Sequence, residues 1–156
     1  MYVGNGFDIH RHTDEKKLVL GGLTFNESGF EAHSDGDIII HAISDALLGS
    51  LRKKDLGHYF PSDDSTPKNI SSIIMLDKVL EVIDIKKVII NNIDITIISE
   101  VINISKISKQ IIENLAKLIN IEPEVINIKG KSFENIGFIG EGLASACIVT
   151  VSVSNA

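Results

Sequence analysis

The chain has 156 residues and a formal net charge of −6, and its Lys and Arg residues form no cluster or stripe. This length predicts a single domain, 1–156, because a chain of about 150 residues buries roughly two thirds of the surface that it exposes when unfolded. The acidic balance argues against a nucleic-acid partner. The apolar runs are shorter than the about 20 residues that span a membrane, so we expect no membrane partner either.

Cysteine usage and the N-terminal residues bear on the compartment. The single cysteine, Cys147, has no internal disulfide partner and stands in an apolar stretch, which predicts a buried, inert thiol. The first residues show no charged segment followed by an apolar one, so we expect no secretory signal. Both observations favour a reducing, cytoplasmic location.

Hydrophobic periodicity predicts one sheet with helices. Apolar residues at helical spacing indicate helices, and runs rich in β-branched residues indicate strands. In chain order we expect strands at 1–10 and 17–23, a helix at 34–50, a loop at 52–68, a helix at 69–83, a strand at 87–98, a helix at 105–119, and strands at 125–133 and 143–153. The predicted fold class is α+β, a single sheet with helices packed on one face.

The first chemical signal is the pair Asp8 and His10. Residues two apart on a strand point to the same face, so the carboxylate and the imidazole can converge on one point. Both groups are suitable zinc ligands. The plainer interpretation is a half-buried strand edge with polar tips.

The second signal is His41, which falls within a helical run of Ile and Ala. A histidine in such a place is commonly a core residue with a satisfied ring. Asp37 and Asp45, however, lie four residues to either side of it on the same helix face. A metal-bound histidine commonly gives its other N–H to a carboxylate, so His41 fits a ligand with Asp45 or Asp37 behind it. Three ligands would leave a fourth zinc position open, as catalysis requires.

Ser34 followed by Asp37 resembles a capping box, which would place His33 and Ser34 at the N-terminus of that helix, where free N–H groups attract anions. Two further segments carry weaker signals. The loop 55–64 reads equally well as a solvated acidic turn. The segment 129–134 and the expected glycine-rich hairpin 137–142 offer Lys and Ser to a phosphate and Glu134 to a hard cation such as Mg²⁺.

Together and in this order, these segments resemble the cyclodiphosphate synthase family of the methylerythritol phosphate route to isoprenoids. The resemblance runs from Gly4 to about Ala146. Its most specific parts are residues 6–10, 32–37, 41–49, 55–61 and 92–98.

The resemblance implies an activity and a set of roles. A cytidine-diphosphate-linked methylerythritol 2-phosphate would be cyclised with release of CMP, using one Zn²⁺ per subunit and Mg²⁺ or Mn²⁺ as second ion. The implied metal ligands are Asp8, His10 and His41 for zinc and Glu134 for the second ion. The implied catalytic residues are His33 and Ser132. The implied substrate-binding residues are Ser34, Asp55, Leu56, Gly57, Phe60, Asp63, Asp64, Lys131 and Phe138.

The family resemblance also implies a homotrimer whose active sites lie between subunits, with a cytidine pocket near residues 99–105 and 130–132. Two departures concern that pocket and its neighbourhood. The family usually has Pro followed by Lys or Arg where this chain has residues 101–103. An Arg that the family carries in the hairpin is missing from residues 137–142. In relatives that Arg helps to hold an anion, often an isoprenoid diphosphate, in the central cavity of the trimer.

Two other functions remain open at this point. One is a zinc phosphoesterase that hydrolyses a nucleotide sugar with water in place of the internal nucleophile. The other is a trimeric binding protein that has lost catalysis, which only the altered loop and the shortened hairpin support.

Overall fold

The computed structural model describes all residues, 1–156. Its strands are β1 (Tyr2–Leu20), β2 (Leu23–Phe30), β3 (Val88–Ile98), β4 (Ile126–Lys131) and β5 (Ala144–Asn155). Its helices are α1 (Ile38–Ser50), α2 (Leu56–Tyr59), α3 (Ser72–Val82), α4 (Ile104–Ile119) and α5 (Gly137–Gly140), with short 3₁₀ helices η1 (Ile85–Lys87) and η2 (Pro123–Val125).

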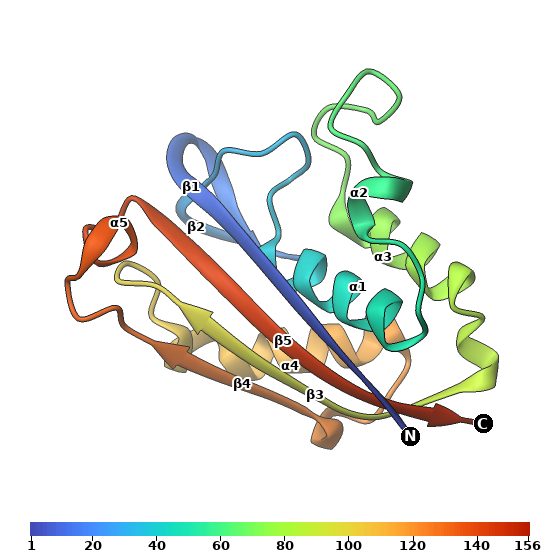
Figure 1. Cartoon of the computed structure of the whole chain (residues 1–156). Coiled ribbons are helices and arrows are strands. Elements are labelled where there is room, and N and C mark those ends of the chain that lie inside the picture. Colours follow the sequence, from blue (N-terminus) through green and yellow to red (C-terminus); the bar gives the residue numbers. More distant parts are fainter.

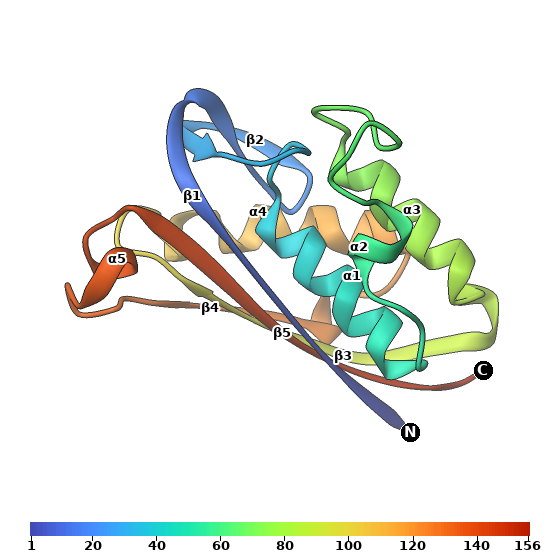
Figure 2. The same ribbon diagram turned by 45° about the horizontal axis from the view of Figure 1, so that its top comes forward.

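All five strands form one mixed sheet in the order β2-β1-β5-β3-β4. Only β3 and β4 run parallel, and the other neighbours are antiparallel. The long helices α1, α3 and α4 cover one face of this sheet (Figures 1 and 2). Burial alternates accordingly along β5, where Val149 and Val151 are buried and Ile148 and Thr150 are exposed. The predicted α+β class is confirmed.

Helix α1 packs directly on the backbone of β1, and two glycines make this possible. A Cβ atom added at Gly4 would lie 1.9 Å from the carbonyl oxygen of Ala46, and one added at Gly6 would lie 1.9 Å from that of Ala42. No side chain fits in such a space, so only glycine allows the approach. The close packing brings the side of α1 that carries His41 against β1.

The core lies between the sheet and the helices and consists mainly of isoleucine, leucine and valine. Cys147 is fully buried within it, as predicted, and burial raises the pKa of its thiol well above the usual value. None of the helices combines the length and the apolar character that a membrane span requires.

The N-terminal strands differ from the prediction. The two strands expected at 1–10 and 17–23 are one strand, β1, which crosses the charged stretch 11–17, and the strand β2 was not predicted. The β1–β2 pairing shifts register between Thr13 and Lys17 and forms the end of the sheet. Water reaches both faces of the sheet there, so the polar side chains of 11–17, which weakened the strand pattern, stay hydrated and cost little free energy on folding.

Three further predictions were wrong in detail. Helix α1 begins at Ile38 and not at residue 34, because the carboxylate of Asp37, not Ser34, accepts hydrogen bonds from the first free N–H groups. The expected loop 52–68 contains the short helix α2. The expected hairpin 137–142 contains a single helical turn, α5, because the N–H of Gly140 bonds back to the carbonyl of Ile136.

Candidate active site

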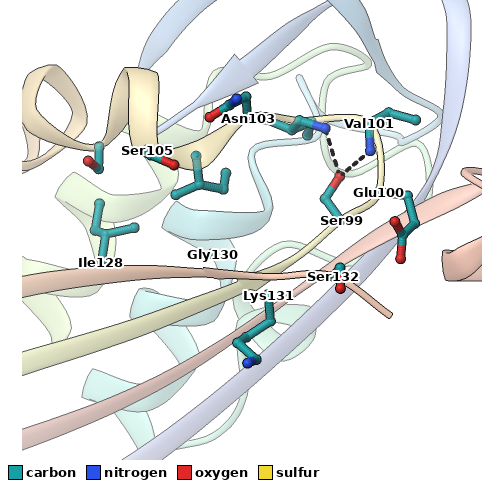
Figure 3. A pocket seen from close by; sticks show the side chains of 12 residues that line it. Ser99, Glu100, Val101, Asn103, Ser105, Ile128, Gly130, Lys131 and Ser132 are labelled. Carbon is teal, nitrogen blue, oxygen red and sulfur yellow. Dashed lines mark hydrogen bonds between the residues drawn. The ribbon is translucent and has the colours of Figure 1, made fainter. Parts of the chain in front are cut away.

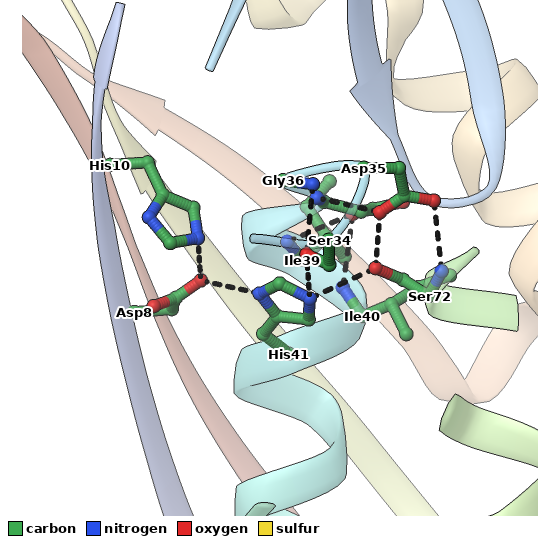
Figure 4. A network of polar contacts seen from close by, with 10 residues as sticks. Asp8, His10, Ser34, Asp35, Gly36, Ile39, Ile40, His41 and Ser72 are labelled. Carbon is green, nitrogen blue, oxygen red and sulfur yellow. Dashed lines mark hydrogen bonds and ion pairs between the residues drawn. The ribbon is translucent and has the colours of Figure 1, made fainter. Parts of the chain in front are cut away.

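Asp8, His10 and His41 converge at the junction of β1 and α1 (Figure 4). The Asp8 Oδ2 atom lies 3.2 Å from His10 Nε2 and 2.9 Å from His41 Nδ1. One ligand atom from each residue lies within 4.8 Å of those of the other two. The strand alternation expected of Asp8 and His10 therefore holds, and α1 supplies the third member.

The electrostatics of this cluster follow from burial and mutual contact. Burial would raise the pKa of the Asp8 carboxyl, but the imidazoles of His10 and His41 outweigh it and hold that pKa well below its usual range. Burial would lower the pKa of His41, but its hydrogen bond with Asp8 and the Asp8 charge raise it. The carboxylate is thus ionised and lies beside two nitrogen atoms that can bind a cation.

The three residues fit a divalent transition metal such as zinc. Two imidazole nitrogens and a carboxylate oxygen form a common catalytic zinc set. The Nε2 atom of His10 is buried and makes no hydrogen bond, although it faces Asp8. A buried ring nitrogen without a partner is costly, and a metal ion would satisfy it.

The ring of His41 is held from behind by Ser72 and Asp35 and not by Asp45 or Asp37 as predicted. The Ser72 hydroxyl donates to the Asp35 carboxylate, so its oxygen is free to accept from His41 Nε2, 2.9 Å away. This contact keeps a proton on Nε2, so Nδ1 can lose the proton that it shares with Asp8 when a cation binds. Asp45 instead accepts from the Leu56 N–H at 2.7 Å.

Asp37 is also committed elsewhere. Besides capping α1, its carboxylate accepts from the Gly22 N–H at 2.7 Å. Its complete burial raises its pKa to about 6. Asp37 therefore ties the β1–β2 turn to the start of α1 and positions the helix that carries His41.

A pocket of about 230 Å³ opens beside the cluster. Its walls include eight of the predicted site residues, namely Asp8, His10, His33, Ser34, His41, Leu56, Gly57 and Phe60. His33 Nε2 lies 2.7 Å from the carbonyl oxygen of Thr66, which accepts its proton and leaves Nδ1 free. The hydroxyl of Ser34 lies 3.2 Å from His41 Nε2.

The remaining predicted site residues of the 55–64 loop lie outside that pocket. Asp55 caps α2 through the His58 N–H at 2.9 Å, and Asp63 accepts from the Ser65 N–H at 2.8 Å. Asp64 is exposed. Asp55 and Asp63 have local structural partners, and none of the three carboxylates lines the pocket beside the cluster.

A second pocket, of about 690 Å³, lies between the 99–105 loop and the end of β4 (Figure 3). Lys131 and Ser132 line it, as does the whole stretch 99–105 in which the cytidine pocket was predicted. Glu134 lies next to it, because its carboxylate accepts from the Ser132 hydroxyl at 2.6 Å. Phe138, on α5, is 56% exposed.

The predicted site residues thus fall into two groups that do not meet within one chain. Neither Lys131, Ser132, Glu134 nor Phe138 lines the pocket beside the metal-ligand cluster. Glu100 joins the second group together, since its carboxylate accepts from the Phe133 N–H at 2.6 Å. Each group is ordered by its own contacts, and neither forms a complete site alone.

From the sequence, neither Ser72 nor Asp35 was assigned a role at the site. The two residues are 37 positions apart, and Ser72 lies 31 positions from His41. No local pattern links them, so only the tertiary packing of α3 against α1 reveals the contact. The flanking Ser71, which caps α3, makes Ser72 look like part of an ordinary helix start.

Fold and site together define an α+β protein with a candidate two-histidine, one-carboxylate metal centre. The sequence model of the YgbB family matches residues 1–154. The chain belongs to this family.

Similar proteins carry two kinds of name. The chain is 40% identical over 157 residues to the 2-C-methyl-D-erythritol 2,4-cyclodiphosphate synthase of Alkaliphilus metalliredigens, covering 99% of each. It is 44% identical over 151 residues to the "Bifunctional enzyme IspD/IspF" of Pelagibacter ubique, covering 96% of this chain but only 41% of that protein. The chain thus spans about two fifths of the bifunctional relative.

Solved structures agree with the fold. The IspF structure of Plasmodium falciparum, described as a CDP complex, superposes with a TM-score of 0.87 at 38% identity, covering 99% of this chain and 96% of that one.

Proposed function

We propose that the chain is a metal-dependent cyclodiphosphate synthase. It would convert 4-diphosphocytidyl-2-C-methyl-D-erythritol 2-phosphate to 2-C-methyl-D-erythritol 2,4-cyclodiphosphate and CMP, which is a phosphorus–oxygen lyase reaction. The observation that carries the proposal is the convergence of Asp8, His10 and His41 beside an open pocket. The names of relatives that the chain matches over nearly their whole length support the product.

Asp8, His10 and His41 would hold one zinc ion per chain, and Glu134 would hold Mg²⁺ or Mn²⁺ together with the substrate phosphates. Zinc prefers nitrogen ligands, and Mg²⁺ prefers oxygen and retains water, so the two donor sets suit different ions. The ions would neutralise and align phosphate oxygens that otherwise repel each other.

The reaction itself needs no covalent nucleophile from the protein. An oxygen of the 2-phosphate attacks the β-phosphorus, and the bond from that phosphorus to the CMP oxygen breaks, so CMP leaves with the electron pair. The task of the chain is to place the two groups in line. We propose that Asp55 binds the erythritol hydroxyls. Leu56, Gly57 and Phe60 would form part of the wall of the pocket beside the metal-ligand cluster.

The polar residues around the phosphates have separate roles in this proposal. Ser132 would steady the transition state by donating a hydrogen bond from its hydroxyl, and His33 by donating from Nδ1 in the imidazolium form, because Nε2 is bonded to Thr66. Ser34 would contact a phosphate beside the metal ligands, and Lys131 the diphosphate. Other substrate contacts are assigned to Asp63, Asp64 and Phe138.

We further infer that the protein is a homotrimer with each site shared by two subunits. The separation of the two residue groups within one chain supports this, because one chain alone leaves the cyclisation site incomplete. The outer sheet face also carries exposed apolar side chains, with Phe7 paired to Ile148 across β1 and β5 and 55% exposed. Ile136 is 69% exposed near the second group. Such apolar surface favours a subunit interface.

The test is product analysis by ³¹P NMR with purified protein, substrate and Mg²⁺. A cyclic diphosphate and CMP in equal amounts are expected. A linear phosphate would instead indicate the phosphoesterase, and substrate binding without turnover would indicate a binding protein. Light scattering measures the oligomeric state of the same protein. A fully active monomer would contradict a site shared between subunits.

A further inference from the structure

The 99–103 segment, which lines one end of the larger pocket, has no regular secondary structure and no proline. It follows β3 and ends where α4 begins, and Asn103 at that helix start makes no capping bond with its side chain. Val101 is 57% exposed and so gains little from packing. Ile102 is buried in the core, so the packing of that side chain and hydrogen bonds together set the shape of this segment.

One side chain, Ser99, supplies most of those bonds (Figure 3). Its hydroxyl oxygen accepts from the N–H of Val101 at 3.2 Å and from the N–H of Ile102 at 3.1 Å. The Ser99 N–H in turn donates to the carbonyl oxygen of Lys131 at 3.0 Å, which ties the segment to β4. The position of one hydroxyl group thus fixes two successive amides of the pocket wall.

That hydroxyl is held by a buried polar chain that crosses the sheet. Ser145 of β5 is completely buried and donates from its hydroxyl to Ser99 Oγ at 2.8 Å. His12 Nε2 of β1 lies 2.8 Å from Ser145 Oγ, and the His12 ring packs 4.8 Å from that of Phe30. A buried hydroxyl is costly unless it is paired, so the three residues depend on one another.

We propose that His12 is a positioning residue for a nucleotide pocket: through Ser145 and Ser99 it holds the Val101 and Ile102 amides in the geometry that receives a cytidine nucleotide. His12 touches no pocket space itself, since it does not line the pocket. Its role is to pre-order a loop that a ligand would otherwise have to order, and such pre-ordering increases affinity. The ligand class rests on the proposed function.

Two substitutions of His12 separate its polar atom from its ring. His12→Phe keeps a ring against Phe30 and removes the bond to Ser145. His12→Gln keeps a polar atom near the Nε2 position. Because a lost hydrogen bond commonly changes an equilibrium by about tenfold, we expect His12→Phe to raise the Kd for CDP about tenfold and His12→Gln to recover most of the loss. Isothermal calorimetry with CDP measures both.

Zinc affinity is measured on the same variants, because His12 follows the candidate ligand His10 by two residues. We expect the zinc Kd to stay within about twofold of wild type, since the hydrogen bonds from His12 through Ser145 to Ser99 lead away from the metal-ligand cluster. A parallel loss of zinc would overturn the proposal, and so would His12→Gln binding CDP as weakly as His12→Phe.

A direct readout comes from amide hydrogen exchange by NMR. The substitution Ser145→Ala removes the middle hydroxyl of the hydrogen-bonded series His12–Ser145–Ser99. In this variant the Val101 and Ile102 amides should exchange faster, while the amides in α1 keep their rates. Unchanged exchange at both amides would overturn the proposal even if His12→Phe fails to fold. If the wild type binds no CDP, the proposed function fails. The exchange rates still decide whether the hydrogen bonds from His12 through Ser145 to Ser99 order the segment 99–103.

Discussion

The two groups of site residues are built in opposite ways. The cluster of Asp8, His10 and His41 lies where a helix packs on a strand with no room for a Cβ atom, and Ser72 holds the His41 ring. The segment 132–142 is mostly exposed, with left-handed backbone at Glu134 and Asn135, and residues 132–156 contain no Lys or Arg. The first region is packed between a strand and a helix, and the second is largely exposed on the single chain.

Removing the negative charge of the cluster tests most directly whether the first region binds the metal. Asp8→Asn keeps the shape but loses the carboxylate that balances a dication, so we expect zinc content near zero and activity below detection. Asp77→Asn, on the exposed side of α3, is the matched control and should keep both. Full zinc content in Asp8→Asn, measured by elemental analysis, would remove the cluster as the metal site.

The close packing of α1 on β1 can be tested through stability. Gly6→Ala places a methyl group 1.9 Å from the Ala42 carbonyl oxygen, so we expect a loss of about 3 kcal/mol or more in the free energy of unfolding. Gly49→Ala is the control, because a Cβ atom there meets nothing within 4 Å. It should stabilise α1 by about 0.5–1 kcal/mol. Urea unfolding compares them, and equal effects would contradict the packing argument.

The support behind His41 predicts a smaller effect on the metal. Ser72→Ala removes the acceptor of the His41 proton and should raise the zinc Kd about 10- to 100-fold, with the three ligands in place. Ser71→Ala removes the cap of α3 instead and should cost about 1 kcal/mol of stability at unchanged zinc affinity. Competition with a chromophoric chelator measures both. Equal zinc affinity in the two variants would show that Ser72 does not support the metal ligand His41.

The second region predicts the smallest effects. In the trimer that we propose, residues 137–142 lack the Arg that the family resemblance implies and offer no other positive charge to an isoprenoid diphosphate in a central cavity, so we expect geranyl diphosphate to bind poorly or not at all in calorimetry. Tight binding would show that the Arg was not needed.

Lys131 lines the larger pocket, so Lys131→Ala should raise the Michaelis constant a few-fold at constant kcat. An unchanged Michaelis constant would show that Lys131 is a solvent-exposed side chain that does not contact the substrate.

What the sequence could predict depended on whether the signal was local. Asp8 and His10 share a face by strand alternation, and His41 stands out in an apolar helix, so the cluster could be inferred. Ser72 could not, because its contact with His41 exists only after α3 packs on α1. The strand across 11–17 was missed because both its faces meet water, and α5 because glycine-rich segments favour no single local structure.

The single cysteine at the centre of the sheet gives the protein a built-in reporter of its own opening. Cys147 lies on the helix-covered face, and a thiol reagent can reach it only when that layer separates from the sheet. The rate at which a reagent modifies the protein would therefore count opening events of the whole domain. One mass-spectrometric time course, with and without zinc, would follow how far zinc binding at the neighbouring cluster slows the exposure of the interior.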